Sequence, residues 1–373
     1  MIRKTNRKIK GNLRKLRINF ARLLWDRSNG HKTKEVNNFL DENEIKSILF
    51  LRAEGKIGDM VISSFVFREI KKKYPSIKIG VVTKGGAKDI ISNNPYVDKI
   101  YDYGNGIFSV KKLAKEISKE KYDLLLEFYE KIKPMEIMFV NKCNAKYNMG
   151  LNKKNWKLFN ISVDEDLNFK WDDHVSKRFM GYLKKLKFNS ENIDDSYEIF
   201  FDEKRLRNLE KFKEQYKNEK IVVLNPFGAS RQRRFSEETI IKILNLLKDN
   251  KVIILYHGDK YKFVKEIGDK YENVIIPEGI ESILDSAVYI SVADTVISPD
   301  TSIIHIADCF NKKIVGVYEH DGGILSAGHK VWGPREKSNH KFVFTPKRKS
   351  LYDNFDVNDF DITEMDKIIK EFC

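Results

Sequence analysis

Two strand-to-helix junctions in the second half of the chain carry side chains suited to binding an anion. The first reads NPFGAS, ends at Ser230 and continues through Arg233. Backbone N–H groups around Gly228 and Ala229, together with the Ser230 hydroxyl, suit a loop that meets a phosphate. Arginine is the residue for two-pronged phosphate contacts. The alternative is a solvated basic turn, with Ser236 as the N-cap of the next helix.

The second junction reads SPDTSIIH and ends at His305. Thr301 and Ser302 lie at a helix start, where unpaired N–H groups attract a diphosphate. His305, one turn further on, could donate to a phosphate or sugar oxygen, whereas its isoleucine neighbours equally suit a half-buried structural histidine. Asp300 is expected to order the loop or to bind sugar hydroxyls. The spacing Asp-Thr-x-x-x-His favours the functional interpretation.

A third junction, in the first half, reads GKIGDM and follows the apolar run SILFL. Gly55 and Gly58 let the backbone approach a ligand closely, and Lys56 lies between them on the expected acceptor side of the cleft. Asp59 has two interpretations. It is the N-cap of the following helix, or a general base that takes a proton from an acceptor hydroxyl. Both can hold, because a capping Asp at the edge of a sheet points into the cleft.

Short apolar runs alternate with helical patterns in both halves, which predicts parallel sheets covered by helices on both faces. A charged, mostly helical stretch at 170–216 separates the two series. The expected strands are 47–51, 77–82, 97–101 and 122–126 in the first series, and 221–224, 252–256, 274–276, 295–297 and 314–318 in the second.

This alternation predicts an α/β fold of two Rossmann-like domains that face each other across a cleft. Ligands of such folds bind at the carboxyl ends of the strands, where the three junctions lie. The expected segments are a basic extension at 1–44, a first Rossmann-like domain at 45–200, a second Rossmann-like domain at 201–355 and a helix at 356–373 that packs back on the body.

The formal net charge of +15 favours anionic partners, and the N-terminus carries much of it. Residues 1–25 contain nine Lys/Arg and no acid, with leucines and Phe20 at helical spacing. We interpret this segment as an interfacial helix on an anionic membrane surface, at roughly 1 kcal/mol per basic residue. A solvated tail is the main alternative, and nucleic-acid binding is disfavoured because no aromatic-interleaved basic module follows.

Several classes of protein are disfavoured by what the sequence lacks. No run of 18 apolar residues and no signal-peptide core appear, so we expect a cytoplasmic protein peripheral to the inner membrane. The three cysteines lie far apart and no metal cluster is evident, so no metal is expected. The missing GxGxxG disfavours a nicotinamide dehydrogenase.

The three junctions together resemble glycosyltransferase family 9, the ADP-heptose:lipopolysaccharide heptosyltransferases. The resemblance covers roughly residues 47–318 in the right order, and its most specific part is Asp-Thr-x-x-x-His. The matching elements are GDMV at 58–61, YP at 74–75, AKYNMG at 145–150, NPFGA at 225–229, RRFS at 233–236 and SPDTSIIHIA at 298–307.

This resemblance implies the GT-B architecture and an inverting transfer that needs neither metal nor cofactor. It makes 45–200 the acceptor-side domain and 201–355 the nucleotide-sugar-binding domain. Two segments depart from the family pattern: LEFYEK at 126–131 replaces an Asp-Leu-Gln-Gly-like stretch, and EHDGG at 319–323 replaces a Gly and Thr-Asp-Pro stretch. By the resemblance, Asp59 is the catalytic base, and the donor is held by Arg233, Asp300, Thr301, Ser302 and His305.

The leading hypothesis is therefore an enzyme that moves a heptose from ADP-heptose to a lipopolysaccharide or lipooligosaccharide core. The expected acceptor is a phosphorylated glycolipid, which would suit the basic charge of the chain. One alternative is a glycosyltransferase of the same fold that uses another nucleotide sugar. Another is a non-catalytic protein that binds a nucleotide sugar or an anionic glycan.

Overall fold

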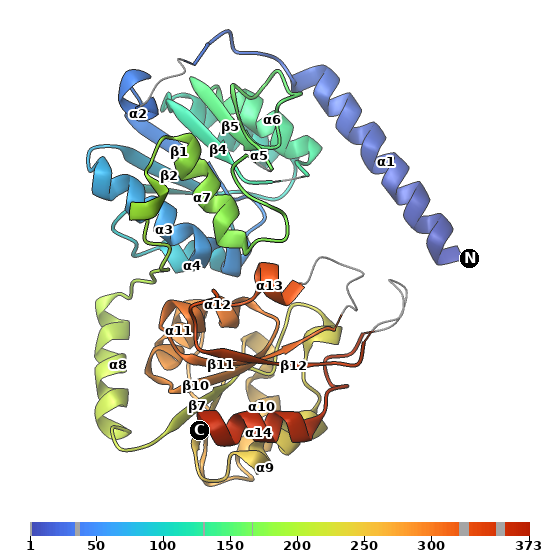
Figure 1. Cartoon of the computed structure of the whole chain (residues 1–373), viewed down its shortest axis with the longest axis vertical. Helices are drawn as coiled ribbons and strands as arrows, with labels where there is room; N and C mark the ends of the chain where they lie inside the picture. The colour runs from blue at the N-terminus through green and yellow to red at the C-terminus, as the bar shows by residue number, and fades with distance from the viewer. Residues whose placement is uncertain (1, 34–37, 130, 166, 321–327, 348–354) are drawn as a thin grey trace.

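The computed structural model describes residues 2–33, 38–129, 131–165, 167–320, 328–347 and 355–373, with side chains from position 11 onward. The chain forms two six-stranded sheets with flanking helices, drawn as an upper and a lower half in Figure 1. Every pair of neighbouring strands in both sheets is parallel. This confirms the predicted fold class.

The first sheet has the strand order β3-β2-β1-β4-β5-β6. Its central strand β1 is apolar throughout, because Ile48 and Phe50 pack into the core on one face while Leu49 and Leu51 pack on the other. The strands are β1 Ser47–Leu51, β2 Lys78–Thr83, β3 Lys99–Asp102, β4 Leu124–Glu127, β5 Tyr147–Leu151 and β6 Ile161–Val163.

Helices cover both faces of this sheet. Residues of α3 and α7 share a core with Ile48 and Phe50, whereas residues of α5 and α6 share a core with Leu49 and Leu51. The helices of this half are α1 Ile2–Trp25, α2 Phe39–Glu42, α3 Ile57–Lys73, α4 Gly86–Ile91, α5 Ile107–Ser118, α6 Pro134–Cys143 and α7 Val175–Lys185.

The second sheet has the strand order β12-β11-β10-β7-β8-β9. α8, Glu203–Gln215, leads from the first half to this sheet along the outside of the molecule (Figure 1). The strands are β7 Ile221–Leu224, β8 Lys251–Ile254, β9 Val274–Ile275, β10 Thr295–Pro299, β11 Lys313–Tyr318 and β12 His340–Phe344.

The remaining helices surround the second sheet, and two of them pack against helices of the first half. α12 packs against α3 and α11 against α4, so helices that follow strands of the two sheets meet directly at the junction between the halves. The last helix packs on β11, β12 and α9. These helices are α9 Glu237–Leu246, α10 Tyr261–Gly268, α11 Ile283–Val292, α12 Ser302–Cys309, α13 Gly328–Trp332 and α14 Ile362–Phe372.

The nine predicted strands are all present, with ends shifted by two residues or fewer. Sequence reasoning missed β5, β6, β12 and the short helices α2 and α13. The sequence of β5, YNMGL, does not predict a strand, because it contains Asn and Gly, which are uncommon in strands. Its Asn148 is nevertheless buried, since the side-chain amide donates to the carbonyl of Leu158 at 2.9 Å.

The basic N-terminal segment forms a long helix, α1, that leaves the body of the first half (Figure 1). Its last turns are anchored: Ala21 is buried, and the Arg22 guanidinium lies 4.2 Å from the Trp156 ring and donates to the carbonyl of Asn155. Within the described parts of the chain, no helix has both the length and the apolar character needed to cross a bilayer.

Candidate active site

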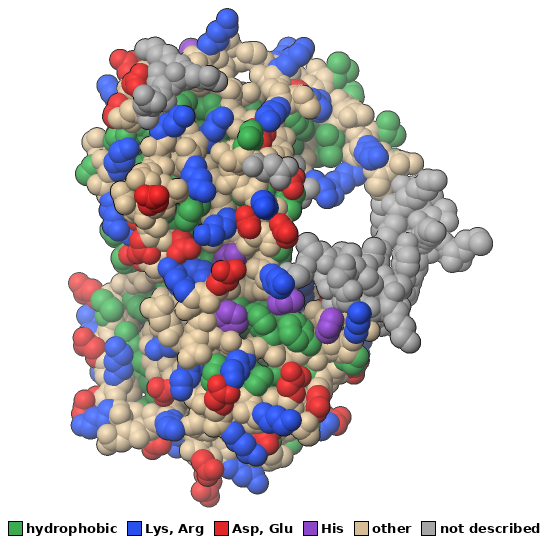
Figure 2. Space-filling model, in the orientation of Figure 1, with side chains coloured by type: hydrophobic (Ala, Val, Ile, Leu, Met, Phe, Trp, Pro, Cys, Tyr) green, Lys and Arg blue, Asp and Glu red, His purple; other side chains and the backbone are tan. Residues whose placement is uncertain are grey.

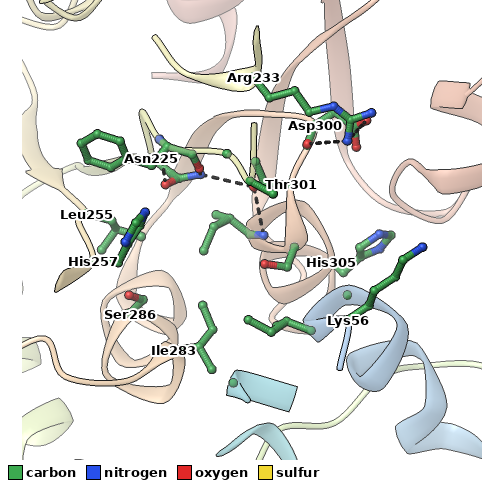
Figure 3. Close-up of a pocket in the computed structure, with 18 of the residues that line it drawn as sticks. Lys56, Asn225, Arg233, Leu255, His257, Ile283, Ser286, Asp300, Thr301 and His305 are labelled. Carbon is green, nitrogen blue, oxygen red and sulfur yellow. Dashed lines mark hydrogen bonds and ion pairs between the residues drawn. The ribbon is translucent and has the colours of Figure 1, made fainter. Parts of the chain in front are cut away.

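A cavity of about 1000 Å³ lies between the two halves, and residues from both line it (Figure 3). The first half contributes the loop after β1 and the start of α4. The second half contributes the loops after β7, β8 and β10 and the residue Trp332 of α13. The cavity therefore lies at the carboxyl ends of both sheets, where a doubly wound fold binds its ligands. Of the predicted site residues, all but Ser230 line it.

Asp59 reaches this cavity from the first turn of α3. The prediction that Asp59 caps the helix is wrong, because Lys56 is the N-cap residue and Asp59 is the third helical residue. The Asp59 side chain is 10% exposed and pairs with Arg52 at 3.6 Å and with Lys56 at 3.8 Å. The carboxylate is therefore shielded and held by two cations, yet it still faces the cavity.

The glycines of this loop have distinct roles. Gly55 has a φ of 65°, and a Cβ there would stand 2.7 Å from the carbonyl oxygen of Lys84. A Cβ on Gly58 would stand 2.6 Å from Cδ2 of His305 on α12. Gly58 thus lets α3 of the first half come into direct contact with α12 of the second.

His305 is buried beneath the cavity, and its Nδ1 has no hydrogen-bond partner among the described residues. Burial lowers the pKa of His305 to about 4, with a further lowering by His174, while Asp308 and Asp59 act in the opposite direction. The imidazole is therefore neutral at neutral pH. It can donate or accept one hydrogen bond towards a ligand, but it does not supply a positive charge.

The start of α12 is arranged around Thr301, the N-cap residue. The Thr301 hydroxyl accepts from the N–H of Ile303 at 3.2 Å and from the side-chain amide of Asn225 at 3.2 Å, as drawn in Figure 3. Asn225 also donates to the hydroxyl of Ser298 at 2.9 Å. Thr301 therefore satisfies one of the helix N–H groups itself, so the diphosphate site expected here relies on the rest of the first turn, beginning with Ser302.

Arg233 and Asp300 form an ion pair at the edge of the cavity, with 3.0 Å between Nη1 and Oδ2 (Figure 3). Burial raises the pKa of Asp300, with Arg233 acting against it and Glu319 adding to it. The Arg233 side chain is 46% exposed, so its guanidinium can reach an incoming anion. The two predicted donor residues are thus adjacent, and Asp300 holds Arg233 at the cavity edge.

The loop after β7 brings Arg233 to this position. A Cβ on Gly228 would stand 2.3 Å from the carbonyl oxygen of Arg233, so the glycine permits the backbone to fold back on itself. Ala229 lines the cavity, whereas Ser230 is exposed outside it as the N-cap of the turn that carries Arg233. Ser236 caps α9 by accepting from the N–H of Thr239 at 3.1 Å, as its alternative interpretation expected.

Sequence reasoning missed one wall of the cavity, which is largely apolar and aromatic. Phe227 and His257 lie with ring centroids 5.6 Å apart, and Trp332 approaches from α13 with its ring 5.6 Å from Nζ of Lys56. Phe227 belongs to the NPFGA motif but was not predicted to line the cavity, whereas His257 and Trp332 lie outside the recognised motifs. The additional lining residues include Phe227, Leu255, Tyr256, His257, Ile280, Ile283, Ser286 and Trp332.

Among the residues that the structure describes, no group of three or more His, Cys, Asp and Glu is placed to hold a metal ion. The cations that line the cavity are Lys56, Arg233 and Arg234, of which Arg234 donates to the carbonyl of Gly228 at 3.1 Å. The expectation of a reaction without a metal stays a prediction.

A shared cavity between two facing parallel-sheet domains is the architecture of GT-B glycosyltransferases. The chain belongs to glycosyltransferase family 9 (heptosyltransferase), whose family model matches residues 110–329. This range contains the donor-side residues from Gly228 to His305 and begins after Asp59. The chain is therefore a glycosyltransferase, as the resemblance indicated.

Curated relatives extend the similarity over most of the chain. A protein of Escherichia coli (strain K12) assigned as lipopolysaccharide heptosyltransferase 4 is 24% identical in an alignment of 344 positions that covers 89% of this chain and 88% of the relative. Lipopolysaccharide heptosyltransferase 1 of Campylobacter coli is 22% identical over 84% of this chain and 96% of its own length. Both alignments reach well beyond the matched family segment.

Solved structures show the same fold at low identity. The family 9 glycosyltransferase of Veillonella parvula DSM 2008 has a TM-score of 0.65 at 16% identity and covers 91% of this chain and 93% of its own. The Escherichia coli heptosyltransferase WaaC with ADP has a TM-score of 0.66 at 13% identity and covers 88% of this chain and all of its own. These similarities establish the architecture.

Proposed function

We propose that this enzyme transfers a heptose from ADP-heptose to the core of a lipopolysaccharide or lipooligosaccharide, with inversion at the anomeric carbon and without a metal ion. One observation carries the proposal: Asp59 from the first half lines the same cavity as Arg233, Thr301 and Ser302 from the second. An acid–base group and an anion site thus face one another across a single reaction space.

In the proposed reaction, Asp59 takes the proton of an acceptor hydroxyl, whose oxygen forms a bond to the anomeric carbon from the face opposite the nucleotide. The bond between that carbon and the diphosphate oxygen breaks, and the diphosphate leaves with the electron pair. Arg233 and the first turn of α12, from Ser302, stabilise the growing negative charge. Neutral His305 contributes a hydrogen bond to a phosphate or sugar oxygen.

The choice of donor draws on two kinds of support. Both curated relatives described above are named as lipopolysaccharide heptosyltransferases, and one structural relative holds ADP. The cavity itself offers Phe227, Leu255 and Ile283 beside the anion site, which suits an apolar nucleobase next to a charged diphosphate. The phosphorylated core acceptor suits the +15 charge of the chain.

A donor panel tests this proposal. The purified enzyme is incubated with a heptose-deficient glycolipid core and, in parallel, with ADP-heptose, ADP-glucose, UDP-glucose or GDP-mannose, and the product is analysed by mass spectrometry and NMR. We expect a heptose added only from ADP-heptose, with inverted anomeric configuration and with unchanged rate in EDTA. Transfer of a hexose from another donor would contradict the donor assignment, and loss of activity in EDTA would contradict the metal-independent reaction.

We also infer that α1 holds the enzyme on the anionic cytoplasmic leaflet of the inner membrane, where the glycolipid acceptor would be met. Four side chains along one stripe of the helix are exposed: Leu13 by 47%, Leu16 by 64%, Phe20 by 63% and Leu23 by 75%. Figure 2 shows hydrophobic side chains, in green, at the upper right of the molecule, where α1 leaves the body in Figure 1. Apolar side chains on a basic helix bind anionic lipid surfaces through both burial and charge.

Vesicle binding tests this inference on the full chain. Co-sedimentation with vesicles of phosphatidylglycerol and phosphatidylethanolamine should exceed that with phosphatidylcholine alone, and should be lost in Leu16→Glu/Phe20→Glu. Leu206→Glu is the matched control, because Leu206 on α8 is 44% exposed. If Leu16→Glu/Phe20→Glu sedimented with anionic vesicles as fully as the wild type, the role of α1 would be contradicted.

A further inference from the structure

A buried charge network extends from Asp59 away from the cavity and into the first half. Arg52, which directly follows β1, is 4% exposed at its side chain and pairs with Glu54 at 2.7 Å and with Asp59 at 3.6 Å, both through Nη2. One guanidinium is thus shared between two carboxylates. The stronger contact is with Glu54, although Asp59 is the group that faces the cavity.

Arg52 has little freedom to leave this position. Its guanidinium lies 5.2 Å from the ring centre of Phe128 and 5.1 Å from that of Phe179. Its Nε has no hydrogen-bond partner among the described residues. A buried cation depends on its counter-charges, because removing one partner leaves it uncompensated. Arg52 therefore depends on Glu54 and Asp59 to compensate its buried charge, and its guanidinium fixes the positions of their two carboxylates.

Tyr129 fixes the second carboxylate of the network. Its hydroxyl donates to Oε2 of Glu54 and accepts from the backbone N–H of Glu54 at 2.7 Å. Burial raises the pKa of Glu54; the charge of Arg52 acts against this, and Asp59 adds to it. Burial therefore favours the protonated form of Glu54, and its contact with Arg52 favours the ionised form.

Hydrogen bonds from Lys153 and to Glu127 fix the backbone of Tyr129. Lys153 donates to the carbonyl of Tyr129 at 2.7 Å and forms an ion pair with Glu127 at 2.9 Å, and the N–H of Tyr129 donates to Glu127 at 2.6 Å. Glu127, Phe128 and Tyr129 belong to the segment 126–131 that departs from the family pattern. This departure thus supplies the parts that hold Arg52 and Glu54.

We propose that Arg52 is a positioning residue that keeps the Asp59 carboxylate ionised and directed at the cavity. Glu54 pairs with the same guanidinium and thereby weakens the effect of Arg52 on Asp59. The proposal rests on the proposed function, in which Asp59 takes the acceptor proton. A nearby cation favours the carboxylate form, and a nearby carboxylate opposes it. Arg52 and Glu54 therefore act on Asp59 in opposite directions, although both lie outside the cavity lining.

Two other groups face Asp59, and neither is altered when Arg52 or Glu54 is substituted. Lys56, at the start of the same helix, lies 3.8 Å from Oδ2 of Asp59. His305, on α12, interacts electrostatically with Asp59 and is neutral at neutral pH because burial lowers its pKa to about 4. Glu54 is also faced by Lys56 and, more remotely, by Glu127.

The experiment is a pH–rate profile of the full-length enzyme, measured as kcat and kcat/KM for heptose transfer. We expect Arg52→Met to lower kcat by at least tenfold and to move the acid limb to higher pH. Glu54→Gln should move the acid limb to lower pH. ADP affinity should stay at the wild-type value in both variants, because neither residue lines the donor site. Glu203→Gln, a change of the same kind at a side chain that is 90% exposed, should leave the profile unchanged.

Opposite displacements of the acid limb would support the positioning role, because simple structural damage has no reason to move it in both directions. Displacement in the same direction, or no displacement by Glu54→Gln, would overturn it. If Arg52→Met does not fold, the isosteric Glu54→Gln decides the matter alone.

The Asp59→Asn background separates this proposal from the proposed function. If Arg52 acts through Asp59, Arg52→Met causes no further loss of kcat in Asp59→Asn. A near-wild-type rate in Asp59→Asn itself would overturn the base role, and the positioning role with it. A slow Asp59→Asn enzyme combined with an unmoved acid limb in Glu54→Gln would overturn the positioning role alone.

Discussion

Gly58 and His305 lie in direct contact across the junction between the two halves, so closely that a Cβ on Gly58 would stand 2.6 Å from Cδ2 of His305. Gly58 precedes Asp59 in α3, and His305 lies one turn into α12. The contact between Gly58 and His305 therefore sets the distance from Asp59 to the donor residues on α12. This contact leaves no room for a side chain at position 58.

Gly58→Ala should slow transfer by about 10–100-fold, because the added methyl must push α3 and α12 apart and a displacement near 1 Å can cost two orders of magnitude in rate. The loss of kcat should exceed any loss of ADP affinity, since the donor residues of the second half keep their mutual geometry. Steady-state kinetics and calorimetric titration with ADP measure the two effects.

Gly11→Ala is the control for this change, because nothing lies within 4 Å of a Cβ at position 11. It should leave kcat and ADP affinity unchanged. A Gly58→Ala enzyme as fast as the wild type would show that the contact with His305 does not set the geometry of the reaction.

Arg233→Met should weaken ADP binding by about 10–100-fold, because a hydrogen bond to a charged group contributes about 1.5–3 kcal/mol. Asp300 holds the Arg233 guanidinium at 3.0 Å, so the cation is already in place when the donor arrives. Calorimetric titration with ADP gives the dissociation constant directly, without need of an acceptor.

Arg231→Met is matched to this variant, because Arg231 belongs to the same turn but lies outside the cavity lining. It removes the same charge and should change ADP affinity little. Equal weakening by both substitutions would indicate a diffuse charge effect and would exclude a specific contact from Arg233.

Lys153→Met should destabilise the fold strongly, because Lys153 and Glu127 form a fully buried ion pair at 2.9 Å. Removing one partner of such a pair costs about 3–5 kcal/mol. Burial raises the pKa of Glu127 from 4.5 to about 7, with Lys153 acting against it. The folded state therefore binds this proton more tightly than the unfolded state, so Glu127 lowers stability as pH rises from 4.5 through 7.

The loss in Lys153→Met should accordingly be largest at pH 8 and smaller at pH 5.5, where Glu127 takes up a proton and no bare charge remains buried. Urea denaturation at the two pH values measures this difference. Lys154→Met is the control, since its side chain is 63% exposed and its partner Asp164 is 3.5 Å away. A loss in Lys153→Met that is the same at both pH values would contradict the buried-pair account.

The sequence predicted the positions that chain-local physics determines. Glycines after an apolar run indicated the loop at Gly55 and Gly58, and the Asp-Thr-x-x-x-His spacing indicated the start of α12. The cavity brings these segments together with Arg233, although they are up to about 250 positions apart. The alternation of strands and helices alone predicted that these segments would lie together at one cleft.

Other features depend on contacts that one sequence does not display. The sequence left a capping role open for Asp59, because Asp is a common N-cap. The backbone is already extended at Lys56, so the helix starts three residues earlier than that role requires. The Arg52–Glu54–Tyr129 contacts join residues about 75 positions apart, so no local pattern indicates them. Trp332 reaches the cavity on a short helix that carries no motif.

The most direct measurement is the rate of heptose transfer by Asp59→Asn, with ADP affinity measured on the same sample. The account predicts a fall in kcat of about 10²–10⁴-fold, the usual contribution of a general base, with ADP affinity unchanged. Asp102→Asn, a change of the same kind at a side chain that is 63% exposed at the end of β3, should transfer at the wild-type rate. Near-wild-type transfer by Asp59→Asn would contradict the account.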